Sequence, residues 1–211
     1  MRVSITRIAL FASLACCTFV LVEPSGARAA RGRTVRTGQT SSWGAAGDTT
    51  AGLSRSYVDH GLGFVKDQRT GLWWEKKSDD GGLHDKDDAY TWTSDTRIAD
   101  GTAFTTFLAA LNTPPCFAGH CDWRLPTSFE LYSLVDMGYF LPTAGPMFDA
   151  GCLPGCGVAT CNCTSGGGYW SSSTPKSFDE LAWLVDFGSG AVVLGYKMQS
   201  YHVRAVRSDR P

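Results

Sequence analysis

The 211-residue chain lacks both an excess of basic charge and a long apolar run beyond its first 22 residues. It carries 19 lysines and arginines against 20 aspartates and glutamates, a formal net charge of −1. Nucleic acids and other polyanions attract proteins through basic surfaces, so this balance argues against such partners. A membrane-spanning helix needs about 20 apolar residues. The sequence after residue 22 therefore predicts neither nucleic-acid binding nor a transmembrane segment.

Common catalytic motifs are also missing. Ser171–Ser173 is not part of a Gly-x-Ser-x-Gly motif, and no His-Glu-x-x-His motif occurs. His120 lies beside Cys121, but a cysteine nucleophile needs a free thiolate, and we expect Cys121 to form a disulfide. The sequence therefore predicts no catalytic residue.

The first 29 residues have the composition of an export signal. Arg2 and Arg7 accompany an apolar run of about 15 residues, Ile8–Val22, which is the length of a signal-peptide core. Ala27–Ala29 has the small-x-small pattern of a cleavage site, so we expect the mature chain to begin at Ala30. Cleavage would remove three arginines and one glutamate, which leaves 16 basic against 19 acidic residues and a net charge of −3.

Two alternatives to a cleaved signal remain open. A membrane anchor would need a longer apolar run. A lipoprotein would be anchored through Cys16 or Cys17, but the apolar run continues past both of them. We therefore prefer cleavage and export.

The exported part divides into two regions by composition. Residues 30–56 are rich in Gly, Ser, Thr, Ala and Arg, which predicts a flexible leader. Residues 57–208 carry aromatic and aliphatic side chains throughout, which predicts one folded domain.

Six cysteines remain after the signal: Cys116, Cys121, Cys152, Cys156, Cys161 and Cys163. An even number in an exported protein predicts disulfides. Cys116 and Cys121 would close a short loop, and Cys161 and Cys163 would pair outward with Cys152 and Cys156. A zinc site made by the last four is the alternative, although its spacing lacks the usual paired CxxC knuckles.

Alternating apolar residues and turn residues predict several strands. The predicted strands are 64–67, 72–75, 169–173, 181–187 and 191–196, with turns at 68–71 and 188–190, and 201–207 closes the domain.

Two helices are predicted in the first half of the domain. Phe104, Phe107, Leu108 and Leu111 form an amphipathic stripe that ends before Pro114–Pro115. The second helix starts at Thr127, which with Glu130 forms a capping box, presents Leu131, Leu134 and Val135 on one apolar face, and ends near Gly138. These elements predict an α+β fold, in which two helices pack on a mainly antiparallel twisted sheet with disulfide-stapled loops.

Several segments in this order resemble one bacterial family of unknown function, which is named after the C-terminal domain of the collagen-like adhesin Lcl. The matching segments are 64–74, 85–92, 104–111, 122–136, 169–173, 183–190 and 201–207. The resemblance covers nearly all of residues 57–207.

This resemblance implies a C-type-lectin-like fold, distantly similar to that of formylglycine-generating enzymes. It implies an interaction module that is secreted, periplasmic or on the outer surface of a bacterial cell. In the adhesin, the domain is linked to sulfated glycans and to cell adhesion. This chain lacks a collagen-like stalk and is acidic, which argues against a sulfated ligand here.

A dense acidic segment is the candidate metal site. Calcium prefers six to eight oxygen ligands, and glycines allow a loop to wrap around an ion. The spacing differs from that of an EF-hand, so a solvated acidic loop is the alternative. The candidate ligands, which surround His84, are Asp79, Asp80, Asp85, Asp87 and Asp88.

A second group of residues is expected to be structural. Trp123 is expected to fill the core beside the second helix. Arg124, together with Arg204 or Arg207, is expected to pair with Asp122, Glu130 or Asp136. The full set is Trp123, Arg124, Pro126, Thr127, Glu130, Arg204 and Arg207. Tyr90, Trp92, Tyr169 and Trp170 could stack on sugar rings, but aromatic residues in strands are more often core.

Three functions follow as hypotheses. The leading one is an envelope module that binds a glycan or a surface protein without catalysis and without an organic cofactor. The second is a structural protein that self-assembles, by analogy with the trimeric adhesin. An enzyme similar to formylglycine-generating enzymes ranks third. No sequence motif identifies the ligand-binding residues.

Overall fold

The computed structural model describes residues 54–95 and 98–209. The predicted signal peptide and all but the last three residues of the predicted leader lie outside these ranges. Within them, no helix combines the length and the apolar composition that crossing a membrane requires.

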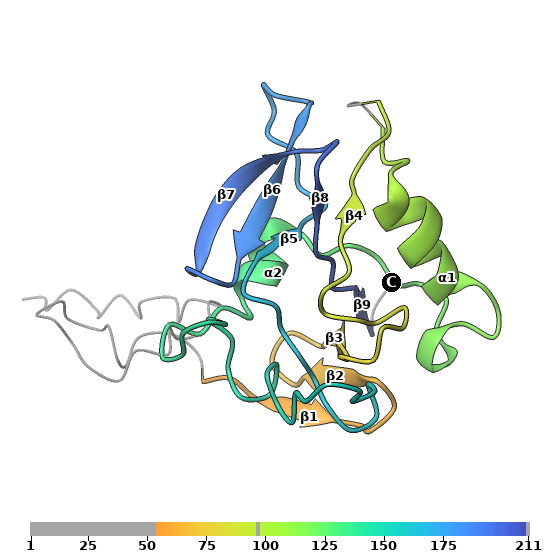
Figure 1. The fold of residues 1–211 in the computed structure, drawn as a ribbon, viewed down its shortest axis with the longest axis vertical. Helices are drawn as coiled ribbons and strands as arrows, with labels where there is room; N and C mark the ends of the chain where they lie inside the picture. Colours follow the sequence, from red (N-terminus) through yellow and green to blue (C-terminus); the bar gives the residue numbers. More distant parts are fainter. Residues whose placement is uncertain (1–53, 96–97, 210–211) are drawn as a thin grey trace, which may run out of the picture. The chain divides into compact units, whose positions relative to one another are not determined.

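The domain is an α+β fold with three small antiparallel sheets (Figure 1). The first joins β1 (Tyr57–Asp59), β2 (Phe64–Asp67), β3 (Leu72–Glu75) and β9 (Val206–Ser208). The second joins β4 (Tyr90–Thr91) and β8 (Ser200–Tyr201). The third joins β5 (Gly168–Trp170), β6 (Leu181–Asp186) and β7 (Ala191–Tyr196).

The prediction of a single sheet was wrong. The closing segment 201–207 is interrupted at residues 202–205, so that β8 and β9 belong to different sheets. The predicted strands at 64–67, 72–75 and 191–196 are confirmed with the same bounds. β5 ends at Trp170, earlier than predicted, because the regular ladder is interrupted at Ser172, which donates its backbone N–H to the carbonyl of Pro126 (2.7 Å). Ser171 and Ser173 on either side still bond to Trp183 of β6 (3.0 and 2.9 Å).

The first predicted helix is confirmed, but it is only partly α-helical. Its first six residues, η1 (Ala103–Leu108), have the wider π-helical winding, and α1 (Ala109–Asn112) completes it. Phe107, Leu108 and Leu111 are buried, as the stripe predicts. A short 3₁₀ turn, η2 (Phe117–Gly119), follows.

The capping box of the second helix, α2 (Ser128–Tyr132), is confirmed. Thr127 Oγ1 accepts from the Glu130 N–H (3.2 Å), and the Thr127 N–H donates to Glu130 Oε2 (2.7 Å). The helix does not continue to Gly138, as predicted. Ser133 Oγ donates to the Glu130 carbonyl (2.6 Å), and Val135 leaves the helical path to bridge with Ala144.

Thr127→Ala is expected to lower the free energy of unfolding by about 1 kcal/mol, because the first turn of α2 loses an acceptor. Urea unfolding measures the change, and Thr174→Ala, at an exposed position, serves as the control. Equal stability of both variants and the wild type would show that the box does not stabilise the fold.

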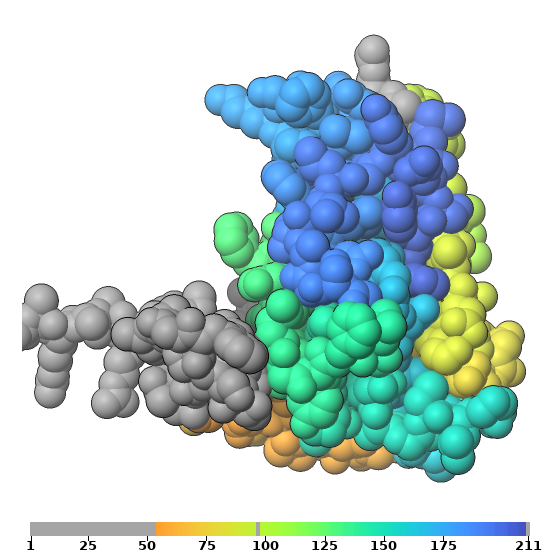
Figure 2. Space-filling view, turned by 60° about the vertical axis from the view of Figure 1, so that its left-hand side comes forward, coloured from red at the N-terminus to blue at the C-terminus, as the bar shows by residue number. Residues whose placement is uncertain are grey.

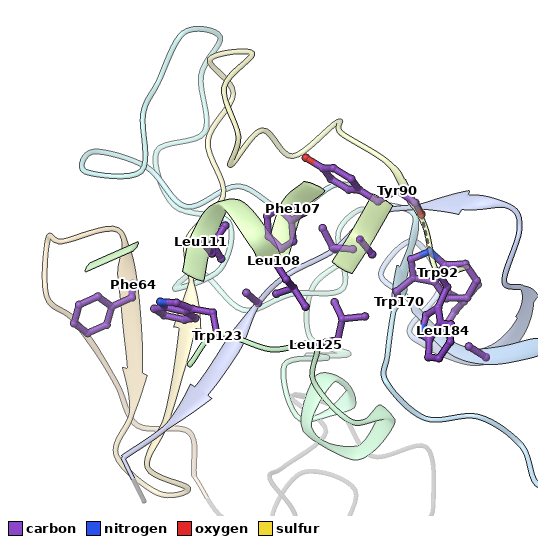
Figure 3. Close-up of a cluster of buried hydrophobic side chains, with 14 residues drawn as sticks. Phe64, Tyr90, Trp92, Phe107, Leu108, Leu111, Trp123, Leu125, Trp170 and Leu184 are labelled. Atoms are coloured by element: carbon purple, nitrogen blue, oxygen red, sulfur yellow. Dashed lines mark hydrogen bonds between the residues drawn. The ribbon is translucent and has the colours of Figure 1, made fainter. Parts of the chain in front are cut away.

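The core consists of two clusters of buried side chains. The first lies between η1–α1 and the second and third sheets, and Figure 3 shows Trp123 in it near Leu111 and Phe64. Trp123 is therefore core, but beside the first helix, where its backbone exchanges two hydrogen bonds with the side chain of Asn112 (2.8 and 2.9 Å). The second cluster packs α2 against the first and third sheets through Leu131, Trp74 and other side chains.

The four aromatic residues considered for sugar stacking are core, as favoured. They are Tyr90, Trp92, Tyr169 and Trp170, all at most 9% exposed. The two indoles donate to backbone carbonyls, Trp92 to Ser171 (3.0 Å) and Trp170 to Tyr90 (2.7 Å), so their polar atoms are satisfied.

Candidate functional site

Two long loops lie against each other and form the candidate site (Figure 1). We name them the acidic loop, residues 78–88, and the cysteine loop, residues 150–163. The Asp79 N–H donates to the Cys156 carbonyl (3.0 Å), and the Gly155 N–H donates to the Asp79 carbonyl (2.5 Å). These reciprocal backbone bonds fix one loop to the other, so the two present a joint surface.

Two of the three disulfides close the cysteine loop. They are Cys152–Cys163 and Cys156–Cys161, and the third is Cys116–Cys121. The predicted short-loop pair is confirmed, and so is the outward pairing of Cys161 and Cys163. The sulfurs of Cys152, Cys156 and Cys163 lie within 4.8 Å of one another because the bridges are adjacent, and they leave no thiolate for the alternative zinc site.

Beneath the cysteine loop lies the guanidinium of Arg204, which is 1% exposed. Its Nη1 donates to the Glu75 carbonyl and to Asn162 Oδ1 (2.9 Å each). Its Nη2 donates to the Cys163 carbonyl (2.5 Å) and to Thr164 Oγ1 (2.9 Å). One side chain from the segment between β8 and β9 thus binds the end of β3 to the end of the cysteine loop.

The buried carboxylate of Glu75 connects this arrangement to the acidic loop. Glu75 Oε1 accepts from Lys77 Nζ (3.2 Å) and lies 2.7 Å from His84 Nδ1. Glu75 Oε2 accepts from the Ala205 N–H (2.8 Å). We call Glu75, Lys77, Asn162 and Arg204 the buried polar network.

Burial and charge act in opposite directions on this network. Burial alone would raise the pKa of Glu75, but Lys77, His84 and the Ala205 N–H outweigh burial and hold that pKa below its ordinary value. Burial lowers the pKa of Lys77, and Glu75 offsets part of that effect. Removing one charge would therefore leave another buried without its partner.

Three of the five proposed calcium ligands come together. Carboxylate oxygens of Asp79, Asp85 and Asp87 lie within 4.8 Å of one another. The other two bond elsewhere: Asp80 accepts from Ser78 and Gly82, and Asp88 accepts from Tyr90.

A lysine of the same loop already pairs with two of these three carboxylates. Lys86 Nζ lies 2.6 Å from Asp87 Oδ2 and 3.2 Å from Asp79 Oδ1. The bond to Asp87 chiefly raises the pKa of Lys86. Asp85 accepts from the N–H groups of Gly81 (2.6 Å) and Asp87 (2.9 Å). Calcium would therefore have to displace an ammonium group that the carboxylates already hold.

The calcium hypothesis predicts a higher melting temperature with added ion than with chelator. At a free calcium concentration a hundred times the dissociation constant, binding would raise the free energy of unfolding by about 2.7 kcal/mol. Lys86→Gln should enlarge the effect by removing the competing ammonium, and Asp85→Asn with Asp87→Asn should abolish it. A melting temperature that calcium leaves unchanged in both the wild type and Lys86→Gln would contradict a metal site here.

The two other arginines of the motif each bond to a carboxylate outside the two loops. Arg124 donates to both oxygens of Glu130 (2.9 and 2.7 Å), the carboxylate that also caps α2. Arg207 donates to both oxygens of Asp122 (2.7 and 3.2 Å). Pro126 is buried.

The expected pairing is confirmed for Arg124 and, of the two alternatives Arg204 and Arg207, for Arg207. Most of the buried polar network was missed. Arg204 bonds backbone carbonyls and neutral side chains in place of Asp122, Glu130 or Asp136, because it lies under the cysteine loop. Asp136 pairs instead with Arg55 (3.1 Å). Glu75 and Lys77 belong to a Glu-Lys-Lys run after an apolar strand, which is typical of a solvated strand end. Only the unusual proximity of these charges to Trp73–Trp74 could have signalled burial.

One family model, described as the Lcl C-terminal domain, matches residues 63–207. The match includes both loops, the whole buried polar network and the α2 capping box. A search of curated proteins finds no match.

Proposed function

The chain belongs to the Lcl C-terminal domain family, and we propose that its domain is an exported module of the bacterial cell envelope that binds a glycan or protein ligand without catalysis. The observation that carries this proposal is the paired acidic and cysteine loops, which are fixed from beneath by buried charges and disulfides. Binding residues are commonly carried on loops that a rigid scaffold positions. Export accords with the three disulfides, which form in oxidising compartments.

A C-type-lectin-like fold is part of the same proposal. Its support is that β2, near the start of the domain, and β9, at its end, share one antiparallel sheet. The disulfide-bearing loop rests on the end of β3 in that sheet through Arg204.

The chemistry of the loops favours a hydroxyl-rich or amino-bearing glycan. Asp80 and Asp87 are exposed, and carboxylates accept hydrogen bonds from hydroxyl and ammonium groups. Leu83 and Leu153 are also exposed on the same pair of loops and could pack on the C–H faces of a sugar. Three carboxylates near one lysine disfavour a sulfated ligand.

No catalytic residue is proposed. Formylglycine-generating enzymes use a thiol pair, whereas the six cysteines of the described domain are all in disulfides.

The test is a glycan array probed with the exported, oxidised protein. We expect the protein to bind neutral or amino sugars selectively. The double variant Asp80→Asn with Asp87→Asn should bind them at least about tenfold more weakly, because charge-assisted hydrogen bonds are about twice as strong as neutral ones. Asp179→Asn, an exposed position outside both loops, is the matched control. Retention of sulfated glycans alone, or equal binding by the loop variant, would overturn the proposal.

A further inference from the structure

The outer edge of β7 is open. Among the described strands, β7 pairs only with β6, at the end of the third sheet. Its six residues, Ala191–Tyr196, include no charged residue and no proline. Edge strands of natural proteins usually carry such residues, or a bulge or cover, which prevent pairing with another chain. β7 carries neither charge nor proline to prevent it.

The backbone groups on this edge are arranged for strand pairing. The Lys197 N–H donates to the Glu180 carbonyl (3.0 Å). In an antiparallel ladder, the backbone N–H and C=O groups of every second residue point toward the same neighbouring strand. The backbone groups of Gly195 and Val193 therefore point toward β6. The residues whose backbone groups point away from β6 are Val192, Leu194 and Tyr196. The Tyr196 carbonyl also accepts from Gln199 (2.8 Å), so its N–H is the freer group.

The side chains of the same three residues form an apolar face. Val192 is opposite Val185 and Leu194 is opposite Trp183 in the β6–β7 register, so they share one side of the sheet. The three side chains are between 40% and 60% exposed. A Cβ on Gly190 would lie 2.6 Å from Met137 Sδ, which places exposed Met137 at the start of this face. In Figure 2 the hairpin of β6 and β7 lies in the blue region, above green residues of the segment that contains α2.

We propose that a second copy of this chain pairs with β7 in antiparallel orientation, about a two-fold axis at Leu194. This register places Leu194 opposite Leu194 of the partner subunit, and Val192 opposite Tyr196 of the partner subunit. All three positions point their backbone groups outward, so the pairing forms about four inter-strand hydrogen bonds. It also joins the two apolar faces into one, and the two three-stranded sheets become continuous.

Self-pairing fits the charges near the edge. Two carboxylates lie at the ends of the hairpin, that of Glu180 just before β6 and that of Asp186 at the end of β6. In the proposed register, Glu180 and Asp186 of the partner subunit are three strand spacings apart, about 14 Å. Because the screening length at physiological salt is about 8 Å, the like charges do not oppose association. Lys197 is buried over the ring of Trp92 and does not reach the interface.

Sedimentation velocity of the full exported chain, over a hundredfold concentration range, tests the proposal. We expect a concentration-dependent dimer. Leu194→Lys should raise the dimer dissociation constant at least about a hundredfold, because two desolvated ammonium groups would meet at the axis. Leu62→Lys, at an exposed apolar position in the β1–β2 turn, is the control and should dimerise like the wild type.

A charge pair tests the register and guards against misfolding. Val192→Lys combined with Tyr196→Glu places opposite charges across the strands and should dimerise more strongly than either single variant. Near-ultraviolet circular dichroism confirms that each variant is folded. A wild-type monomer at every concentration, a trimer, or a dimer that folded Leu194→Lys leaves intact would overturn the proposal.

Discussion

Arg204→Met is expected to lower the free energy of unfolding by about 3–5 kcal/mol, the usual cost of removing one member of a buried charged group. Methionine fills much of the same volume but donates no hydrogen bond. Its introduction would leave the carbonyls of Glu75 and Cys163 and the amide oxygen of Asn162 without this donor. Buried acceptors without partners are costly, so the cysteine loop should lose order first.

Urea unfolding of the oxidised protein measures this effect, with Arg69→Met at an exposed turn as the control. Arg204→Lys separates charge from geometry. It keeps the positive charge, but its compact ammonium cannot reproduce the planar fork of the guanidinium, so we expect an intermediate loss. Arg204→Met as stable as Arg69→Met would show that the network does not support the fold.

Glu75→Gln is also expected to lower the free energy of unfolding by about 3–5 kcal/mol. Glutamine keeps the shape and an acceptor oxygen, but it removes the negative charge opposite Lys77 Nζ. Lys77 is 1% exposed, so its ammonium would remain buried without that counter-charge. Asp179→Asn is again the matched control.

The stability difference between the wild type and Glu75→Gln should depend on pH. The pKa of Glu75 in the fold lies below its ordinary value of about 4.3, because Lys77, His84 and the Ala205 N–H outweigh burial. The carboxylate therefore contributes stability that is fully present above about pH 4.3 and is lost as the pH falls through the folded pKa. Paired unfolding curves from pH 7 to pH 2.5 should show the difference shrinking. A difference that is constant over this range would contradict the proposed role of the Glu75 charge.

The parts of the fold that local chemistry decides were predictable. Thr127 and Glu130 cap α2 through contacts three residues apart, and the β2–β3 turn lies between its own strands. The end of α2 was not predictable in the same way, because Val135 leaves the helix for a bridge with Ala144.

The candidate site depends on contacts between distant residues, which sequence patterns do not reveal. Arg204 and Glu75 are 129 positions apart, and Lys77 bonds Asn162 across 85. These residues are buried because the cysteine loop packs on the end of β3. A local pattern of apolar residues does not predict such a long-range contact. The composition of the acidic segment predicted the cluster of carboxylates. It did not predict that Lys86 pairs with both Asp79 and Asp87.

Pairing through β7 would give each assembly two copies of the loop surface. The dimer edge belongs to residues 191–196, whereas the loops belong to residues 78–88 and 150–163, so the two surfaces use different segments. Two weak sites on one particle bind a repetitive glycan more strongly than one site does. Dimerisation would thus strengthen attachment to an envelope polymer without a change in the site itself.

The central claim is that the paired acidic and cysteine loops are the ligand surface. Hydrogen–deuterium exchange of the oxidised protein, with and without the glycan that the array retains most strongly, tests it most directly. We expect the glycan to slow exchange in residues 78–88 and 150–163 of the wild type. In the double variant Asp80→Asn with Asp87→Asn, the same glycan should leave exchange in both loops unchanged. Protection confined to other segments, such as the first sheet or the edge of β7, would contradict it.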